Sequence, residues 1–218
     1  MPWRAVVGLA VAGLALVALG FQLAPSLGLA GHASTGASAE VPGTSPTSET
    51  PVVPARRVGA LRPEAPSRVV LPDGRVVPVS PADVRGNGSL AVPDDIATAG
   101  WWRGGARLGD PFGSTLIAAH VDSFTQGLGP FASLLSVTRG ATLTLSSPHL
   151  REEYRVSSLT LVPRGQLRSH PELFSGRGKP RLTLVTCAGP YDPARGGYQN
   201  LAVITALPHG DVARRAGR

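Results

Sequence analysis

Leu182-Thr183-Leu184-Val185-Thr186-Cys187 is an apolar run that ends in the only cysteine of this 218-residue chain. A second run, Ser114-Thr115-Leu116-Ile117-Ala118-Ala119, ends in His120 in the same way. Short runs rich in Val, Ile, Leu and Thr are typical of buried strands. Two such strands could bring a thiol and an imidazole together at their ends, as a cysteine nucleophile and its acid/base partner require. The alternative is a buried, inert cysteine, because free cysteine packs like a small hydrophobic residue.

Short strand signals also fill the rest of the region from about residue 67 to residue 208. Asp73-Gly74 lies between two valine-rich segments, residues 68–71 and 76–79, and predicts a tight hairpin. Further strands are expected at residues 89–92, 114–119, 142–145, 154–161, 182–186 and 201–206. Helical pieces are expected to be few: a short turn near residues 94–99 and a segment at residues 130–135. This pattern predicts an all-β domain, a closed barrel with few and short helices.

The N-terminal part has the composition of a membrane anchor followed by a linker. Residues 5–23 carry no charge, and a helix of these 19 residues would span roughly 28 Å, about one hydrocarbon core. A cleavable signal peptide is the alternative, since Ala37-Ser38-Ala39 resembles a cleavage site. We expect, in chain order, a cytoplasmic N-terminus (1–4), a transmembrane helix (5–23), a flexible Pro/Ser/Ala-rich linker (24–66), the folded domain (67–208) and a basic, frayed C-terminal tail (209–218).

Charge and cysteine content exclude several kinds of partner. The formal charge of +7 comes from scattered arginines, without the aromatic-interleaved basic patch of a nucleic-acid-binding protein. One cysteine rules out a disulfide within the monomer and a cysteine-rich zinc site, and no carboxylate pair is placed for calcium. We therefore expect no cofactor, no metal and no nucleic-acid partner. With Arg4 on the cytoplasmic side, the expected location is a single-pass cell-membrane protein with an extracellular domain.

Several motifs together resemble one protein family. Thr183-Leu184-Val185-Thr186-Cys187 matches the T-L-x-T-C signature of sortases, the membrane-anchored cysteine transpeptidases of Gram-positive bacteria. Ala119-His120-Val121-Asp122-Ser123 looks like their histidine segment. The segments at residues 90–95, 188–192 and 196–198 are similar to those of the actinobacterial class E/F branch. The resemblance spans about Val69 to Pro208 and implies a sortase-like closed β-barrel.

The resemblance implies a function and a set of site residues. Cys187 would attack the Thr–Gly bond of an L-P-x-T-G or L-A-x-T-G sorting signal, and His120 would act as the acid and base. Arg195 would position the substrate and stabilise the oxyanion. Asp122, Thr186 and Gln199 are candidates for support or substrate contact. The expected partners are surface proteins with C-terminal sorting signals, an amine of the cell-wall precursor, and the membrane.

The arginine is where this chain departs from the family. Gln199 occupies the position at the start of the last strand where sortases often carry their arginine. Arg195 lies four residues earlier in a glycine-rich loop, and Arg181 is a more distant candidate. Two alternatives to an active sortase follow. One is a catalytically degenerate, sortase-like wall-binding module, and the other is an L,D-transpeptidase-like peptidoglycan crosslinker, although the context of Cys187 does not fit that class.

Four other prominent residues have simpler interpretations. His149 and His170 lie beside prolines in polar segments and are expected on the surface. Trp101 and Trp102 are expected to pack in the barrel rather than to form a ligand platform.

Overall fold

The structure is a computed structural model that describes residues 61–86 and 88–215. The expected membrane helix at residues 5–23 and nearly all of the expected linker lie outside these residues. Within the described ranges, no helix has the length and hydropathy that crossing a bilayer requires.

The strands close into a barrel. They are β1 (Arg68–Val70), β2 (Val76–Ala82), β3 (Ala99–Trp102), β4 (Ser114–Ala118), β5 (Asp122–Ser123), β6 (Gly127–Leu128), β7 (Thr142–Ser146), β8 (Leu150–Pro163), β9 (Arg181–Asp192), β10 (Gly197–Pro208) and β11 (Ala213–Arg214). The main sheet has the order β10-β9-β4-β3-β2-β1-β7-β8-β11, and β10 also pairs with β8. This second pairing closes the sheet on itself and confirms the predicted all-β barrel.

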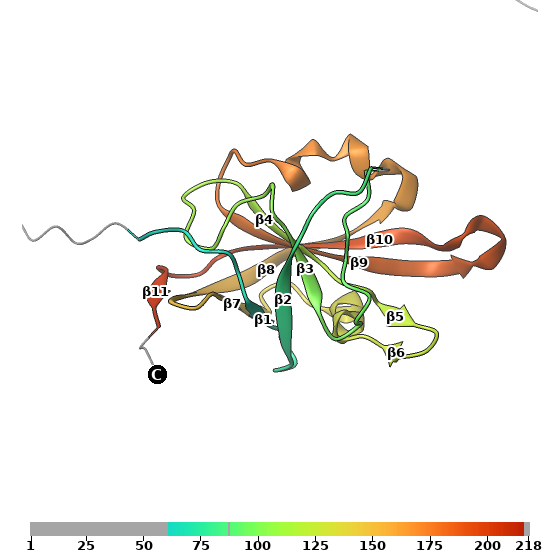
Figure 1. Cartoon of the computed structure of the whole chain (residues 1–218), viewed down its shortest axis with the longest axis horizontal. Helices are drawn as coiled ribbons and strands as arrows, with labels where there is room; N and C mark the ends of the chain where they lie inside the picture. Colours follow the sequence, from blue (N-terminus) through green and yellow to red (C-terminus); the bar gives the residue numbers. More distant parts are fainter. Residues whose placement is uncertain (1–60, 87, 216–218) are drawn as a thin grey trace, which may run out of the picture. The chain divides into compact units, whose positions relative to one another are not determined.

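The helical segments are short 3₁₀ turns between strands. They are η1 (Pro130–Ser136), η2 (Arg164–Ser169), η3 (Pro171–Phe174) and η4 (Pro193–Arg195). The segment expected at residues 130–135 is η1. The short turn expected near residues 94–99 is present before β3, whereas η2 and η3 were not predicted because their sequence has no sustained helical period. Figure 1 shows η2 and η3 on the connection from β8 to β9, and the β5–β6 and β9–β10 hairpins projecting to the same side.

The first hairpin follows from its turn residues. Strands β1 and β2 pair antiparallel with Val69 opposite Val77, as predicted. Gly74 has φ of 86° and donates its N–H to the carbonyl of Leu71 at 2.9 Å. A residue with a side chain is strained at this φ, so glycine is needed for the tight return.

The strand predictions failed in two places, and both involve short segments. The segment expected as a strand at residues 89–92 makes one isolated bridge, between Val84 and Leu90. The strand β3 was missed because it is brief and pairs in parallel with β2, from which it is separated by a long loop. No local turn marks a parallel pairing, so it leaves little signal in the sequence.

Both ends of the folded domain extend beyond the expected limits of residues 67 and 208. Glu64, within the expected linker, bridges Leu108, and its carboxylate accepts hydrogen bonds from the Ser147 hydroxyl at 2.6 Å and the His149 N–H at 3.1 Å. The C-terminal segment was expected to be frayed, but β11 pairs with the start of β8. These contacts are non-local, so composition alone could not reveal them.

The interior of the barrel is filled by side chains that alternate along the strands. Leu182 and Leu184 of β9 and Ile204 of β10 are fully buried there, each worth about 1.5–3 kcal/mol relative to an exposed side chain. Trp101 is also buried and donates its indole N–H to the carbonyl of Ala106 at 3.1 Å. This confirms its expected packing role.

A second apolar cluster lies on the opposite face of β4, β9 and β10. We call it the outer cluster, and it consists of Leu116, Ala118, Val162, Leu173, Val185 and Val203. Residues of η2 and η3 belong to it or pack against it, and the ring of Phe174 meets Trp102 edge-on at 5.7 Å between centroids. Along these strands, the side chains that point away from the barrel interior are therefore buried as well, beneath η2 and η3.

Candidate active site

The parallel pair β4–β9 brings the histidine and the cysteine together. Ala118 of β4 lies opposite Val185 of β9, and the Ala119 N–H donates to the carbonyl of Val185 at 3.1 Å. Continuing this register by two residues sets His120 beside Cys187. Both side chains are partly exposed, so a substrate can reach them from solvent. The two strand-end residues that the sequence singled out therefore lie at one end of the same strand pair.

A buried hydroxyl fixes the end of β4 against β9. Thr186 is buried, and its hydroxyl donates to the carbonyl of Ala119 at 2.9 Å, directly before His120. At the other end of the same strands, the Thr183 hydroxyl pairs with the Ser114 hydroxyl at 2.8 Å. The structure thus gives Thr186 a positioning contact within the protein.

The groups around the Cys187 thiol shift its pKa in opposite directions. Burial raises the pKa of the Cys187 thiol above its ordinary value, the Arg164 guanidinium counteracts the shift, and the Asp122 carboxylate adds to it. The thiolate is the nucleophile, so at neutral pH only a minor fraction of the protein is in the reactive form.

Arg195 does not lie where we expected it. It ends η4, and its Nε donates to the Asp192 carboxylate at 2.7 Å while 75% of its side chain is exposed. Asp192 also accepts the N–H of Ala194 at 3.0 Å and so caps the same turn. Because the turn places a carboxylate three residues before it, the guanidinium pairs with Asp192 within its own turn.

Arg164 is the arginine whose charge acts on the thiol, and the sequence analysis did not identify it. It is the first residue of η2, directly after β8, and its Nη1 donates to the carbonyl of Gly196 at 2.8 Å. A strand at residues 154–161 was predicted, but the pairing of β8 with β10 was not. Without that pairing, nothing in the sequence indicates that the end of β8 approaches the end of β9.

The two other arginine-related candidates have local roles. Gln199 is partly buried, and its side-chain amide donates to the carbonyl of Gly197 within the same hairpin. Arg181 begins β9, at the end of the strand away from Cys187. Its guanidinium donates to the carbonyls of Glu172 and Lys179, and so holds the loop before the strand.

Asp122 is bound to a tyrosine of the neighbouring hairpin. The Tyr198 hydroxyl donates to the Asp122 carboxylate, and this bond raises the pKa of Tyr198 to about 12. The Tyr198 ring meets that of Tyr191 edge-on at 5.0 Å. Asp122 therefore ties the segment after His120 to the β9–β10 hairpin.

His149 and His170 lie at the surface, as predicted. His149 and His170 pair through Nδ1 with Glu64 at 2.9 Å and Glu172 at 3.0 Å, and their side chains are 77% and 37% exposed. Across residues 61–86 and 88–215, no group of three or more His, Cys, Asp or Glu could hold a metal ion.

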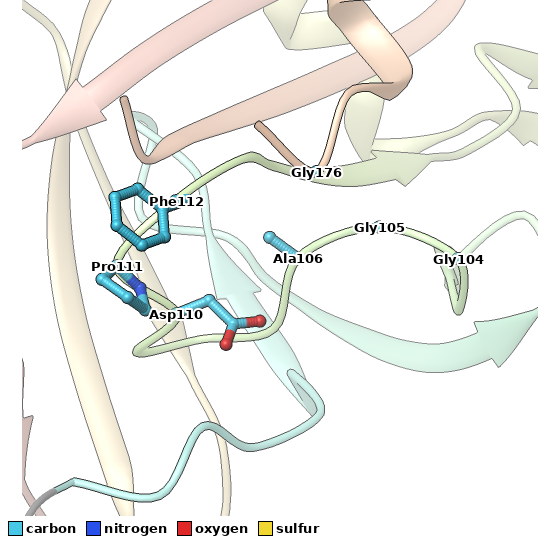
Figure 2. Close-up of a pocket in the computed structure, with 7 residues that line it drawn as sticks. All are labelled: Gly104, Gly105, Ala106, Asp110, Pro111, Phe112 and Gly176. Atoms are coloured by element: carbon cyan, nitrogen blue, oxygen red, sulfur yellow. The ribbon is translucent and has the colours of Figure 1, made fainter. Parts of the chain in front are cut away.

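A small pocket lies at the other end of β4. Phe112, Pro111, Asp110 and the glycines 104, 105 and 176 line it together with Ala106 (Figure 2). All of them precede β4 except Gly176, which precedes β9, whereas His120 follows β4. The pocket is therefore separate from the candidate active site.

The opposing charges around the thiol predict how it titrates. Since burial raises the pKa of Cys187, alkylation by iodoacetamide should reach half its maximal rate at a higher pH than for free cysteine. Asp122→Asn removes a negative charge that disfavours the thiolate, and should lower that pH. Asp83→Asn, at an exposed carboxylate paired with Arg103, is the control and should leave it unchanged. An unchanged or higher midpoint in Asp122→Asn would contradict this description.

Two threonines of β9 give a matched pair of variants. Thr186→Val and Thr183→Val each remove one buried hydroxyl, so each should lower the free energy of unfolding by roughly 1–3 kcal/mol. Thr186→Val should also reduce turnover by roughly tenfold, because it releases the carbonyl next to His120 and small displacements of a catalytic group are costly. Thermal unfolding and peptide turnover measure the two effects. Equal losses of turnover in both variants would argue against a positioning role of Thr186.

The site can therefore perform cysteine-based acyl transfer. A partly exposed thiol lies beside an imidazole, and the charge of a guanidinium acts on the thiol. A thiolate attacks acyl carbons, and an imidazole next to it can transfer the protons.

Known proteins agree with this assignment. A family model described as the sortase domain matches residues 74–208. No curated protein matches the sequence. Similar solved structures include the SrtA sortase from Actinomyces oris, with a TM-score of 0.53 and 19% identity over 74% of this chain and 93% of that chain. Sortase E1 from Streptomyces coelicolor, with a tripeptide in its active site, has a TM-score of 0.52 and 15% identity over 70% and 91%.

At these identities the structural similarity concerns the fold, whereas the family model covers more than half of the chain. The structural similarity extends over the β-barrel that the pairing of β8 with β10 closes. The chain belongs to the sortase family, whose members are cysteine transpeptidases.

Proposed function

We propose that this protein is a membrane-anchored, class E/F-like sortase that attaches surface proteins to the cell wall. Its substrate would be a C-terminal sorting signal of the L-P-x-T-G or L-A-x-T-G type. The observation that carries the proposal is the β4–β9 register, which sets His120 beside Cys187 at an accessible strand end.

In the first step, the Cys187 thiolate attacks the carbonyl carbon of the threonine in the signal. A C–S bond forms, the Thr–Gly C–N bond breaks, and His120 donates a proton to the departing glycine amine. The carbonyl oxygen carries negative charge in between, which a cationic donor and backbone N–H groups would stabilise.

In the second step, an amine of the cell-wall precursor attacks the thioacyl carbon. His120 takes a proton from this amine, a new amide forms, and Cys187 leaves as the thiolate. The peptide substrate agrees with the tripeptide in the active site of the Streptomyces coelicolor relative. The enzyme needs no cofactor for either step.

The proposed location rests on the N-terminal sequence. Residues 5–23 would anchor the protein with its N-terminus in the cytoplasm, and residues 24–66 would hold the catalytic domain outside the membrane. The acyl acceptor and the sorting signals would then lie on the same side as Cys187.

A second candidate is a degenerate sortase that binds the wall without catalysis. It is favoured by Gln199, which stands where sortases often carry an arginine, and by the outward-facing Arg195. Membership of the sortase family leaves the L,D-transpeptidase alternative without support.

The test is a cleavage and transfer assay with the full-length chain in detergent. Fluorogenic peptides with either sorting signal, and controls with threonine and glycine exchanged, are incubated with a panel of primary amines. We expect products in which the threonine carbonyl is joined to the amine, identified by mass spectrometry. Absence of cleavage across the panel, with intact Cys187, would favour the wall-binding alternative.

A further inference from the structure

The active site needs a cationic donor, and the arginine chosen from the sequence does not supply it. Negative charge develops on the substrate carbonyl oxygen during acyl transfer and is stabilised by fixed donors near the thiol. Arg195 pairs with Asp192 and is mostly exposed, and Gln199 is neutral. Another group of the described domain must therefore supply the donor near the thiol.

The pairing of three strands leads from the cysteine to Arg164. Cys187 of β9 lies opposite Leu201 of β10, and Leu201 lies opposite Val162 of β8. Directly opposite residues share a face of the sheet. Val162 and Val185 belong to the outer cluster, so Cys187, two residues beyond Val185, projects on that side.

Arg164 follows Val162 by two residues and so continues the same face. Pro163 between them is still in extended conformation and pairs with Asn200 of β10. Continuing this register sets Arg164 beside Gln199, the position of the usual sortase arginine. A guanidinium directly after β8 thus lies at the position where the neighbouring strand β10 lacks one.

The guanidinium of Arg164 is held in place by one hydrogen bond, which leaves its other N–H donors for further partners. Its Nη1 donates to the carbonyl of Gly196 at 2.8 Å, which fixes it against the β9–β10 hairpin. A guanidinium has five N–H donors, and this bond uses one of them. The side chain is exposed, so its other donors are open to solvent and free to bind a substrate. Its charge also lowers the pKa of the Cys187 thiol, against the effect of burial.

We propose that Arg164 is the catalytic arginine of this enzyme, donating from the end of β8 to the carbonyl oxygen under attack, and that Arg195 only closes the β9–β10 turn. This inference rests on the proposed sortase function. It assigns to the first residue of η2 the role that the usual sortase pattern places at the start of β10.

The first test compares two arginines in the peptide-cleavage assay with the full-length chain. Arg164→Ala should lower kcat/KM by about 10²–10³, as loss of an oxyanion donor does. Arg164→Lys should recover little, because lysine lacks the planar, two-pronged donor set. Arg195→Ala is the matched control and should stay within about twofold of wild type, since it breaks only an exposed ion pair.

A rescue variant excludes a purely structural role. Gln199→Arg in the Arg164→Ala background restores a guanidinium from the adjacent strand and should recover about tenfold or more of the lost kcat/KM. Arg164→Gln, which keeps a long polar side chain, serves if Arg164→Ala unfolds. An Arg164→Ala enzyme within about threefold of wild type, or a larger loss in Arg195→Ala, would overturn the inference.

Thiol titration separates this inference from the proposed function. Alkylation of Cys187 by iodoacetamide needs no sorting peptide, so it reports the charge of Arg164 even if wild type cleaves no peptide. Arg164→Ala should shift the pH of half-maximal alkylation upward, whereas Arg195→Ala should not shift it. An unshifted midpoint in Arg164→Ala overturns the inference. An inactive wild type with a shifted midpoint overturns the sortase function and leaves only the placement of the Arg164 charge beside the thiol.

Discussion

Replacing Cys187 by alanine should abolish peptide cleavage and transfer. The nucleophile forms the bond to the substrate, so its loss should reduce kcat by about 10⁴-fold or more. Cys187 is partly exposed at a strand end, so the free energy of unfolding should change by no more than about 1–2 kcal/mol. Peptide turnover and thermal unfolding of the full-length chain measure both quantities.

Cys187→Ser is the companion variant for this result. The hydroxyl has nearly the shape of the thiol but does not ionise at neutral pH, so this variant should be folded and equally inactive. Cleavage that persists in Cys187→Ala would rule out the thioacyl mechanism.

Replacing His120 by alanine should have the second-largest effect. General acid–base catalysis contributes about 10²–10⁴-fold, so kcat/KM should fall by about that factor. His170→Ala is the control, because that imidazole pairs with Glu172 on the surface and should leave turnover unchanged.

The same pair should also determine the pH dependence of the wild type. Activity needs Cys187 as thiolate and His120 protonated, so kcat/KM should be bell-shaped, with apparent values that belong to the coupled pair. Because burial raises the thiol pKa, a smaller fraction of the protein carries the thiolate together with protonated His120, and the maximum of the profile should be low. A profile that rises without falling at high pH would argue against His120 as the acid.

The sequence predicted the elements whose signals are local. The Asp73-Gly74 turn and the runs before His120 and Cys187 carry their own pattern, and each became a strand or hairpin. The strand β11 pairs with the distant start of β8, and its two residues have no pattern of their own. Such pairings are fixed by the closed barrel and not by neighbouring residues.

The same distinction between local and distant signals applies to the candidate active site. Cys187 and His120 end strong apolar runs, so their positions follow from the strands that carry them. Arg195 looked suitable by its distance along the chain, but Asp192 captures its guanidinium within one turn. The contact of Arg164 with the β9–β10 hairpin depends on the β8–β10 register, which only the folded barrel defines.

The most direct test of the account is the intact mass of the enzyme during turnover. The full-length chain is mixed with a sorting peptide in the absence of an amine acceptor, quenched in acid and analysed by mass spectrometry. We predict a mass increase equal to the peptide up to and including its threonine, located by digestion on Cys187 and absent from Cys187→Ala. Unmodified protein during active cleavage, or an adduct on another residue, would contradict a thioacyl-enzyme at Cys187.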